Sequence, residues 1–136
     1  MGRAKKGKIL LVEDDPDTRM VLTLLFEMEG FTVVDAEDGQ EGYLKACDEP
    51  PDLIITDINM PKISGLDLMK LVQQNAALAE IPVVVLSALE RNYLKRAKEL
   101  GAAATCQKPV EFDQILPLAA SLVAAHKCSR HRLKRR

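Results

Sequence analysis

The sequence predicts an α/β protein in which a parallel sheet of five strands is covered by helices on both sides. Short apolar segments rich in Val, Ile and Leu alternate five times with longer segments whose apolar residues recur at helical spacing. Strands that alternate regularly with helices pair in parallel, because each right-handed crossover returns the chain to the same end of the sheet. With 136 residues, 47% of them hydrophobic, the chain is long enough to fold as one domain around its own core.

Each element of this alternation has its own local signal. The strands are predicted from short apolar runs at 8–12, 31–34, 52–56, 81–87 and 102–107. The helices are predicted from apolar residues three and four positions apart at 15–30, 37–49, 66–75, 90–100 and from 112 onward. The last strand, "AAATCQ", has the weakest signal because alanine dominates it.

The first and last predicted helices have the clearest patterns. Asp15 and Pro16 suit the cap and first turn of the first helix, and Gly30 suits its stop. The apolar stripe of the first helix consists of Met20, Val21, Leu24, Leu25 and Met28. The apolar face of the last helix consists of Phe112, Ile115, Leu116, Ala119, Leu122 and Val123.

Composition excludes several classes of protein. No apolar run approaches the roughly 18 residues that a membrane span needs, and the apolar stretch in the basic N-terminus, "MGRAKKGKILLV", is too short for a signal peptide. The three cysteines are far apart and form no CxxC pair, which favours free thiols in a reducing compartment over disulfides or a zinc site. We therefore expect a cytoplasmic protein.

The charge of the chain is unevenly distributed. The last eleven residues, "HKCSRHRLKRR", hold six Lys and Arg and no acid, so residues 1–125 retain 13 Lys and Arg against 20 Asp and Glu. Both histidines also lie in this segment, which excludes a histidine base, metal ligand or phosphohistidine inside the fold. We expect a basic extension over 1–7, one domain over 8–126 and a disordered basic tail over 127–136. The tail favours weak electrostatic contacts, but it has no aromatic residue to stack on bases, so we expect no sequence-specific nucleic-acid binding.

Polar side chains stand at the ends of four of the five predicted strands. They are Glu13, Asp14 and Asp15 after the first strand, Asp57 after the third, Ser87 at the end of the fourth and Lys108 after the fifth. The carboxyl ends of parallel strands meet at one edge of the sheet, where such sheets bind ligands. We therefore expect an acidic cluster, a further carboxylate, a hydroxyl and one cation at the same edge.

This set of residues fits a site that receives a phosphoryl group. Crowded carboxylates repel one another and need a cation, and a site with oxygen ligands only favours Mg²⁺ over zinc. Lys108 would neutralise an anion, Ser87 would donate a hydrogen bond to it, and Asp57 would be the nucleophile. A nucleotide pocket is excluded, because "EDDPD" after the first strand has no glycine-rich phosphate loop and its charge repels a pyrophosphate.

Four motifs resemble, in order, those of the receiver domains of two-component response regulators: "VEDD", "DLIITDINMPKISG", "VVVLSA" and "KP". The resemblance covers residues 8–124. It implies a flavodoxin-like fold with strand order 2-1-3-4-5, in a receiver that acts through protein contacts or as a phosphorelay intermediate. The implied partners are a sensor histidine kinase or a histidine phosphotransfer protein, together with a downstream protein target.

The resemblance also assigns a role to each residue at the strand ends. Asp57 is the implied phosphoacceptor, Ser87 takes the position of the switch hydroxyl, and Lys108 that of the phosphate-binding lysine. The implied Mg²⁺ ligands are Glu13, Asp14, Asp57 and the backbone carbonyl of Asn59. The implied function is that of a phosphoryl acceptor in signal transduction, not of an enzyme, with only self-catalysed phosphotransfer and dephosphorylation.

Two positions depart from the family pattern. Thr105 stands where a Tyr or Phe is usual, three residues before Lys108, so the aromatic side chain that swings inward on phosphorylation is missing. Val110 stands where Phe commonly follows Lys-Pro. Neither change touches the phosphorylation chemistry, but we expect signalling to run through Ser87 and the helix that follows it.

Two other functions share part of this pattern. A phosphatase of the haloacid dehalogenase type also uses a strand-end Asp and Mg²⁺, but it needs a second Asp two residues on. This chain has Asn59 there, whose amide is neither acid nor base. The alternative is a receiver-like module that binds partners without phosphorylation, which Thr105 favours and the intact set of strand-end residues disfavours.

Overall fold

The computed structural model describes residues 6–60, 62–88 and 91–135, and these contain five strands and five helices. The strands are β1 (Lys8–Val12), β2 (Thr32–Ala36), β3 (Leu53–Asp57), β4 (Val83–Ser87) and β5 (Ala104–Gln107). The helices are α1 (Pro16–Met28), α2 (Gly39–Asp48), α3 (Gly65–Gln74), α4 (Arg91–Glu99) and α5 (Phe112–Arg135). Most of the basic extension predicted over 1–7 lies outside the described residues.

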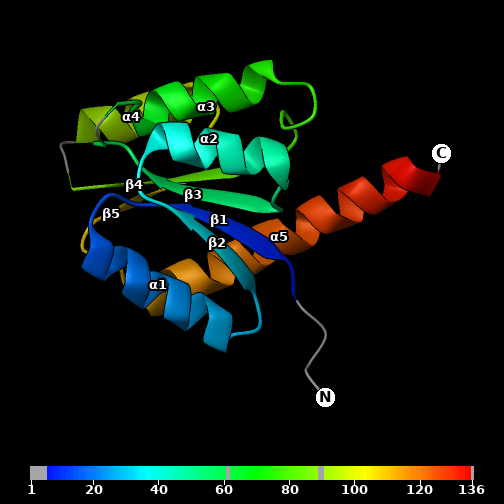
Figure 1. The fold of residues 1–136 in the computed structure, drawn as a ribbon, viewed down its shortest axis with the longest axis horizontal. Helices are drawn as coiled ribbons and strands as arrows, with labels where there is room; N and C mark the ends of the chain where they lie inside the picture. The colour runs from blue at the N-terminus through cyan, green and yellow to red at the C-terminus, as the bar shows by residue number, and fades with distance from the viewer. Residues whose placement is uncertain (1–5, 61, 89–90, 136) are drawn as a thin grey trace.

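All five strands pair in parallel in one sheet, in the order β2-β1-β3-β4-β5, which confirms the predicted fold class and strand order. One face of the sheet is covered by α1 and α5, and the other by α2, α3 and α4 (Figure 1). The register aligns Val12 with Thr56 and Asp57 with Leu86. The C-terminal ends of β1, β3 and β4 therefore lie side by side at one edge of the sheet.

The central strands are buried on both faces. In β1, Ile9 and Leu11 pack with α1 and α5, whereas Leu10 and Val12 pack with the helices on the opposite face. All five residues of β3 are buried, including Asp57 at its end. Two-sided burial explains why these strands appear in the sequence as continuous apolar runs and not as an alternating pattern.

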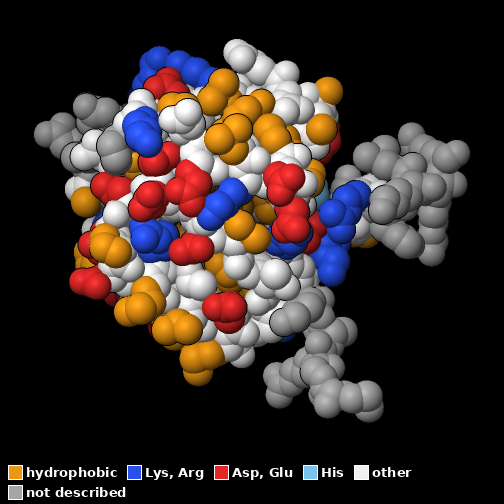
Figure 2. Space-filling model, in the orientation of Figure 1, with side chains coloured by type: hydrophobic (Ala, Val, Ile, Leu, Met, Phe, Trp, Pro, Cys, Tyr) orange, Lys and Arg blue, Asp and Glu red, His pale blue; other side chains and the backbone are white. Residues whose placement is uncertain are grey.

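α1 packs on the sheet through a different face from the apolar stripe that its sequence suggests. Leu22 and Phe26 are buried, and the Phe26 ring meets the rings of Phe31 and Phe112 edge to face, with centroids 5.9 and 5.0 Å apart. The apolar residues of α1 that are half exposed or more are Met20, Val21, Leu24 and Met28. Figure 2 shows hydrophobic side chains gathered on the outside of the molecule over α1. The helix thus has one apolar stripe in the core and another facing solvent.

α5 continues through the segment predicted as a disordered tail and ends at Arg135, so the structure differs from that prediction. After Pro117 the sequence holds no Gly or Pro that would end the helix. Lys and Arg are good helix formers, and their positive charge near a helix C-terminus offsets the helix dipole. A basic composition therefore extends this helix. Among the described residues, no helix has the length and apolar character needed to span a bilayer.

A buried acid just before β3 fastens the C-terminal half of α5 to the sheet. Asp52 is 4% exposed, and its Oδ2 accepts a hydrogen bond from the backbone N–H of Lys8 at 3.0 Å. Its Oδ1 lies 3.1 Å from Nδ1 of His126 and 3.4 Å from Nη1 of Arg130. His126 is therefore packed against the fold, contrary to the expectation of a fold without histidine. It lies at the opposite end of β3 from Asp57.

Asp52→Ala should lower the free energy of unfolding by about 3 kcal/mol, because it leaves the partly buried backbone N–H of Lys8, His126 and Arg130 without their acceptor. The matched control is Glu49→Gln, which removes an exposed ion pair of 3.2 Å with Lys8 and should cost less than about 0.5 kcal/mol. Chemical denaturation of both variants measures the difference. Equal losses would show that Asp52 does not anchor α5.

Candidate functional site

The structure brings the predicted strand-end residues together at one edge of the sheet. Glu13 follows β1, Asp57 ends β3, Ser87 ends β4 and Lys108 follows β5. The side chains of Glu13, Asp57 and Ser87 are buried, whereas Asp14 is exposed. The site therefore combines two buried acids, a buried hydroxyl and an acid that faces solvent.

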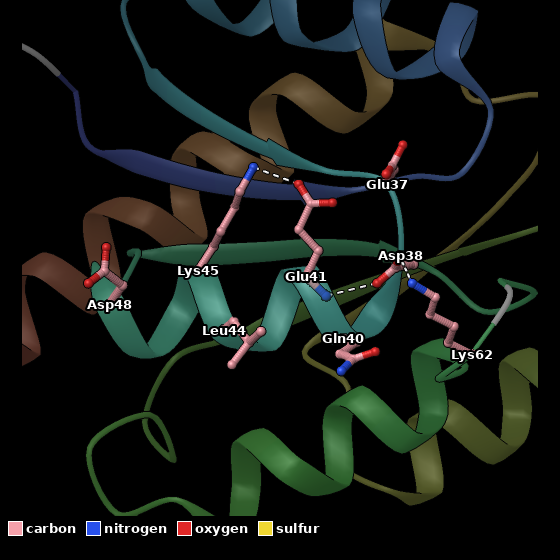
Figure 3. Close-up of a pocket in the computed structure, with 8 residues that line it drawn as sticks. All are labelled: Glu37, Asp38, Gln40, Glu41, Leu44, Lys45, Asp48 and Lys62. Atoms are coloured by element: carbon pink, nitrogen blue, oxygen red, sulfur yellow. Dashed lines mark hydrogen bonds and ion pairs between the residues drawn. The ribbon is translucent and has the colours of Figure 1, made fainter.

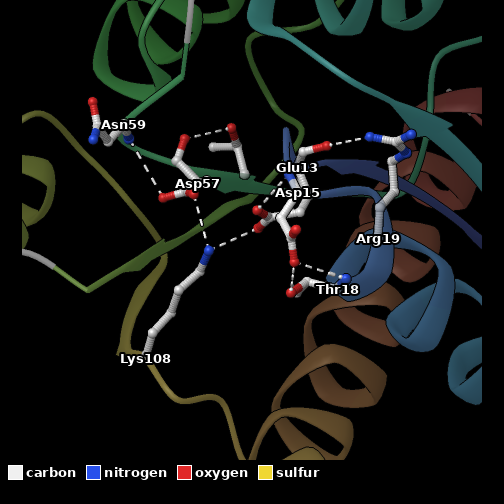
Figure 4. A network of polar contacts seen from close by, with 8 residues as sticks. Glu13, Asp15, Thr18, Arg19, Asp57, Asn59 and Lys108 are labelled. Carbon is white, nitrogen blue, oxygen red and sulfur yellow. Dashed lines mark hydrogen bonds and ion pairs between the residues drawn. The ribbon is translucent and has the colours of Figure 1, made fainter.

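The ammonium group of Lys108 joins two of these acids (Figure 4). Its Nζ lies 2.9 Å from Oε2 of Glu13 and 2.9 Å from Oδ2 of Asp57. The backbone N–H of Lys108 donates a hydrogen bond to the carbonyl oxygen of Ser87 at 2.8 Å, and a cis peptide bond joins the lysine to Pro109. Lys108 thus connects the ends of β1, β3, β4 and β5.

Burial and neighbouring charges shift the pKa values of Glu13 and Lys108. Burial raises the pKa of Glu13, and the charge of Asp57 adds to this, while the hydrogen bond from Lys108 opposes it. Burial by itself would lower the pKa of Lys108, but the hydrogen bonds and charges of Glu13 and Asp57 outweigh it, so that pKa is raised. Lys108 is therefore a cation at neutral pH, and Glu13 is an acid that a nearby cation stabilises in its charged form.

The turn between β1 and α1 is held by several hydrogen bonds. Asp15 caps α1, as predicted, because its Oδ2 accepts from the backbone N–H of Thr18 at 3.0 Å and from the Thr18 hydroxyl. The backbone N–H of Asp15 donates to Oε1 of Glu13 at 3.2 Å. Arg19 donates from Nη1 to the carbonyl oxygen of Glu13 at 2.8 Å, and its Nε lies 3.3 Å from Oδ2 of Asp35. Arg19 does not stand out in the sequence, since a lone arginine in the first turns of a helix has the pattern of an ordinary surface charge.

The loop between β3 and α3 approaches Asp57 closely. The backbone N–H of Asn59 donates to Oδ1 of Asp57 at 3.4 Å, and that of Gly65 donates to the carbonyl oxygen of Ile58 at 2.8 Å. A Cβ on Gly65 would lie 2.2 Å from the carbonyl oxygen of Asp57, so only glycine fits there. The loop therefore packs directly on the backbone of the predicted phosphoacceptor.

The two positions that depart from the family pattern lie on the side of β5. Thr105 pairs in register with Val85, and Gln107 pairs with Ser87 two residues further along the strands. Thr105 and Val110 both line one pocket, together with residues of β5 and of the start of α5. Two small side chains therefore border a hollow where larger aromatic side chains are usual in the family pattern described above.

Three carboxylates at the strand ends are close enough to hold one metal ion. One oxygen from each of Glu13, Asp14 and Asp57 lies within 4.8 Å of the others. All the donors are oxygens, and two of the three residues are buried, which fits Mg²⁺ better than a metal that prefers sulfur or imidazole. The structure thus places an acidic cluster where the magnesium site is predicted.

A second acidic group, Glu37, Asp38 and Glu41, lies at the start of α2 (Figure 3). Asp38 caps this helix by accepting a hydrogen bond from the backbone N–H of Glu41 at 2.8 Å. Lys45 pairs with Glu41 at 2.8 Å, and Lys62 pairs with Asp38 at 3.5 Å. A helix cap and surface ion pairs therefore account for this group without a metal.

Comparisons with known proteins agree with the geometry of the strand-end site. The family described as "Response regulator receiver domain" matches residues 9–120. A gliding motility regulatory protein from Myxococcus xanthus is 41% identical over 86 residues, which are 63% of this chain but 11% of that protein. A probable chemotaxis protein CheY from Rhizobium etli is 31% identical over 117 residues, which are 85% of this chain and 91% of that protein.

A solved structure extends the similarity to three dimensions. The chemotaxis response regulator CheY4 of Vibrio cholerae superposes with a TM-score of 0.79 at 26% identity, over 88% of this chain and 99% of that one. The chain thus spans a small part of the Myxococcus protein and nearly all of the two chemotaxis proteins.

Proposed function

Because the chain belongs to the family of response regulator receiver domains, we propose that Asp57 is its phosphoryl-accepting residue and that phosphorylation alters its contacts with other proteins. One observation carries this proposal: the carboxylate of Asp57 stands at the end of β3, beside Glu13 and 2.9 Å from Nζ of Lys108. A carboxylate in this position is a nucleophile next to a fixed cation. We take residues 8–126 as the receiver unit.

Transfer to Asp57 forms an acyl phosphate. A carboxylate oxygen bonds to phosphorus while the bond between phosphorus and the donor atom breaks, and the leaving group keeps the electron pair of that bond. The donor atom is a ring nitrogen of a phosphohistidine, or the acyl oxygen of acetyl phosphate. The ammonium group of Lys108 offsets charge on the phosphoryl oxygens, and the Ser87 hydroxyl donates a hydrogen bond to one of them.

The metal that this chemistry calls for is Mg²⁺. The residues that would hold it are Glu13, Asp14 and Asp57 through their side chains. The resemblance to the family adds the backbone carbonyl of Asn59. Bound there, Mg²⁺ would offset the negative charge on the phosphoryl oxygens. The all-oxygen donor set supports this assignment.

The proposed donor is a sensor histidine kinase or a histidine phosphotransfer protein, and the proposed output is a contact with a further protein. The chain acts as an acceptor and not as an enzyme, since each Asp57 takes up one phosphoryl group until that group is hydrolysed. A module that works without phosphorylation is less well supported, because the full set of acids, hydroxyl and lysine is present. Free thiols at Cys47, Cys106 and Cys128 support a location in the reducing cytoplasm.

The proposal is tested by incubating the protein with acetyl phosphate and Mg²⁺ and measuring its intact mass. We expect the mass of one phosphoryl group to be added, and peptide mapping after borohydride reduction to place it at Asp57. A sample treated with EDTA should stay unlabelled, because the crowded acids then lack their metal. Labelling at another residue, or equal labelling in EDTA, would contradict the proposal.

A further inference from the structure

Arg19 makes two contacts at once beside the strand-end acids. Its Nη1 donates a hydrogen bond to the carbonyl oxygen of Glu13 at 2.8 Å (Figure 4). Its Nε lies 3.3 Å from Oδ2 of Asp35, near the end of β2. The Arg19 side chain is only 18% exposed. These contacts join α1, the end of β1 and β2 through one side chain.

The carbonyl that Arg19 holds belongs to the peptide bond between Glu13 and Asp14. A peptide unit is planar, so fixing its oxygen fixes the direction in which the chain enters Asp14. Glu13 is held on its other side as well, because its backbone N–H donates to the carbonyl oxygen of Ala36 at 3.0 Å. Asp14 is the exposed member of the three acids, so its orientation depends on the backbone more than on packing.

The carboxylate of Asp35 explains how the guanidinium of Arg19 can lie beside the acidic site without repelling a metal ion there. An unpaired guanidinium near the metal ligands would repel a divalent cation, whereas the carboxylate of Asp35 offsets that charge. The planar fork of arginine can donate to a carbonyl and a carboxylate together, and the ammonium of a lysine cannot match that geometry.

We propose that Arg19 is a positioning residue for the magnesium site, holding the peptide between Glu13 and Asp14 so that the Asp14 carboxylate faces the metal. This inference rests on the proposed function, because it presupposes a metal at Glu13, Asp14 and Asp57. It assigns Arg19 a task in metal binding in addition to its part in packing α1.

The direction in which Mg²⁺ affinity changes when Arg19 is replaced distinguishes a positioning role from an effect of its charge alone. If Arg19 acts only through its charge, Arg19→Gln removes a repulsive cation and Mg²⁺ binding becomes tighter. If Arg19 positions Asp14, the same change weakens binding, and the loss should be about 10-fold, as for other groups that orient metal ligands. Arg19→Lys should lie between the wild type and Arg19→Gln, because a lysine still donates to the carbonyl.

The experiment measures the Mg²⁺ dissociation constant by isothermal titration calorimetry for the wild type, Arg19→Gln, Arg19→Lys and the control Asp35→Asn. The control keeps the hydrogen bond to the Glu13 carbonyl but leaves the Arg19 charge unpaired. Because solvent and salt screen this charge, the dissociation constant should rise by less than about 3-fold. Thermal unfolding in EDTA reports on stability separately. At saturating Mg²⁺, the rate of labelling by acetyl phosphate in the Arg19 variants should return to near the wild-type value.

Unchanged or tighter Mg²⁺ binding in Arg19→Gln would overturn the inference, as would an equal loss in Asp35→Asn. If Arg19→Gln does not fold, the comparison of Arg19→Lys with Asp35→Asn decides, since Arg19→Lys should weaken Mg²⁺ binding more than Asp35→Asn does. Failure of the proposed function looks different: the wild type then takes up no phosphoryl group at any Mg²⁺ concentration.

Discussion

Asp57→Asn should abolish phosphoryl transfer from acetyl phosphate, with a fall in rate of at least about 10³-fold, while the protein stays folded. An amide oxygen carries no charge and is a poor nucleophile, so no acyl phosphate forms at this position. Asn has nearly the shape of Asp, and Lys108 keeps its contact with Glu13 at 2.9 Å. The loss therefore reflects chemistry and not disruption of the edge of the sheet.

The rate is measured from the increase in intact mass over time, with circular dichroism to confirm folding. Asp48→Asn is the matched control, since Asp48 is an exposed acid at the end of α2 and its removal should leave labelling unchanged. Equal labelling of Asp57→Asn and the wild type would mean that another carboxylate accepts the phosphoryl group.

Lys108→Ala should slow labelling by about 10²-fold, because the cation that offsets charge on the transferred group is gone. The same variant should bind Mg²⁺ a few-fold more tightly, since an ammonium that contacts two metal ligands is removed. Intact mass measured at successive times gives the labelling rate, and calorimetry gives the Mg²⁺ dissociation constant. Lys70→Ala is the control, because Lys70 is an exposed lysine on α3. A large loss of Mg²⁺ binding in Lys108→Ala would show that the lysine has a different role.

The stability of Lys108→Ala should depend on pH in a defined direction. The pKa of Glu13 is already raised by burial, and removal of the lysine takes away the hydrogen bond that opposes this rise. The folded state then binds a proton more readily than the unfolded state, so the folded state gains stability as the pH falls through the raised pKa. Relative to the wild type, the variant should lose about 2 kcal/mol at neutral pH, and this deficit should shrink as the pH falls through the raised pKa of Glu13. A deficit that grows toward low pH would contradict this account.

The sheet and the residues at its edge could be predicted from sequence because both depend on local patterns. The buried body of β3 requires apolar residues, so an acid at its end stands out, and parallel strands place such ends together. The contact of Lys108 with both Glu13 and Asp57 agrees with the prediction that the strand-end residues lie together. Arg19 could not be found in this way, since its task depends on how α1 is rotated against β2, which no local pattern specifies.

The orientation of α1 and the end of α5 show two further limits of local patterns. In α1 two apolar stripes lie side by side, and only packing against Phe31 and Phe112 decides that Leu22 and Phe26 face the core. In α5 the change to a basic composition looks like the end of the domain. The decisive contact joins His126 to Asp52, which lies far away in the sequence.

α5 is held to the sheet at two places, through Ile115, Ala119 and Val123 in the core and through the contact of His126 with Asp52. At about 1.5 Å per residue, some 21 Å of helix lie between Phe112 and His126, and about 14 Å lie between His126 and Arg135. The basic end and the sheet edge that carries Asp57 are therefore joined by a continuous helix and not by a flexible linker, so the helix sets the distance between them.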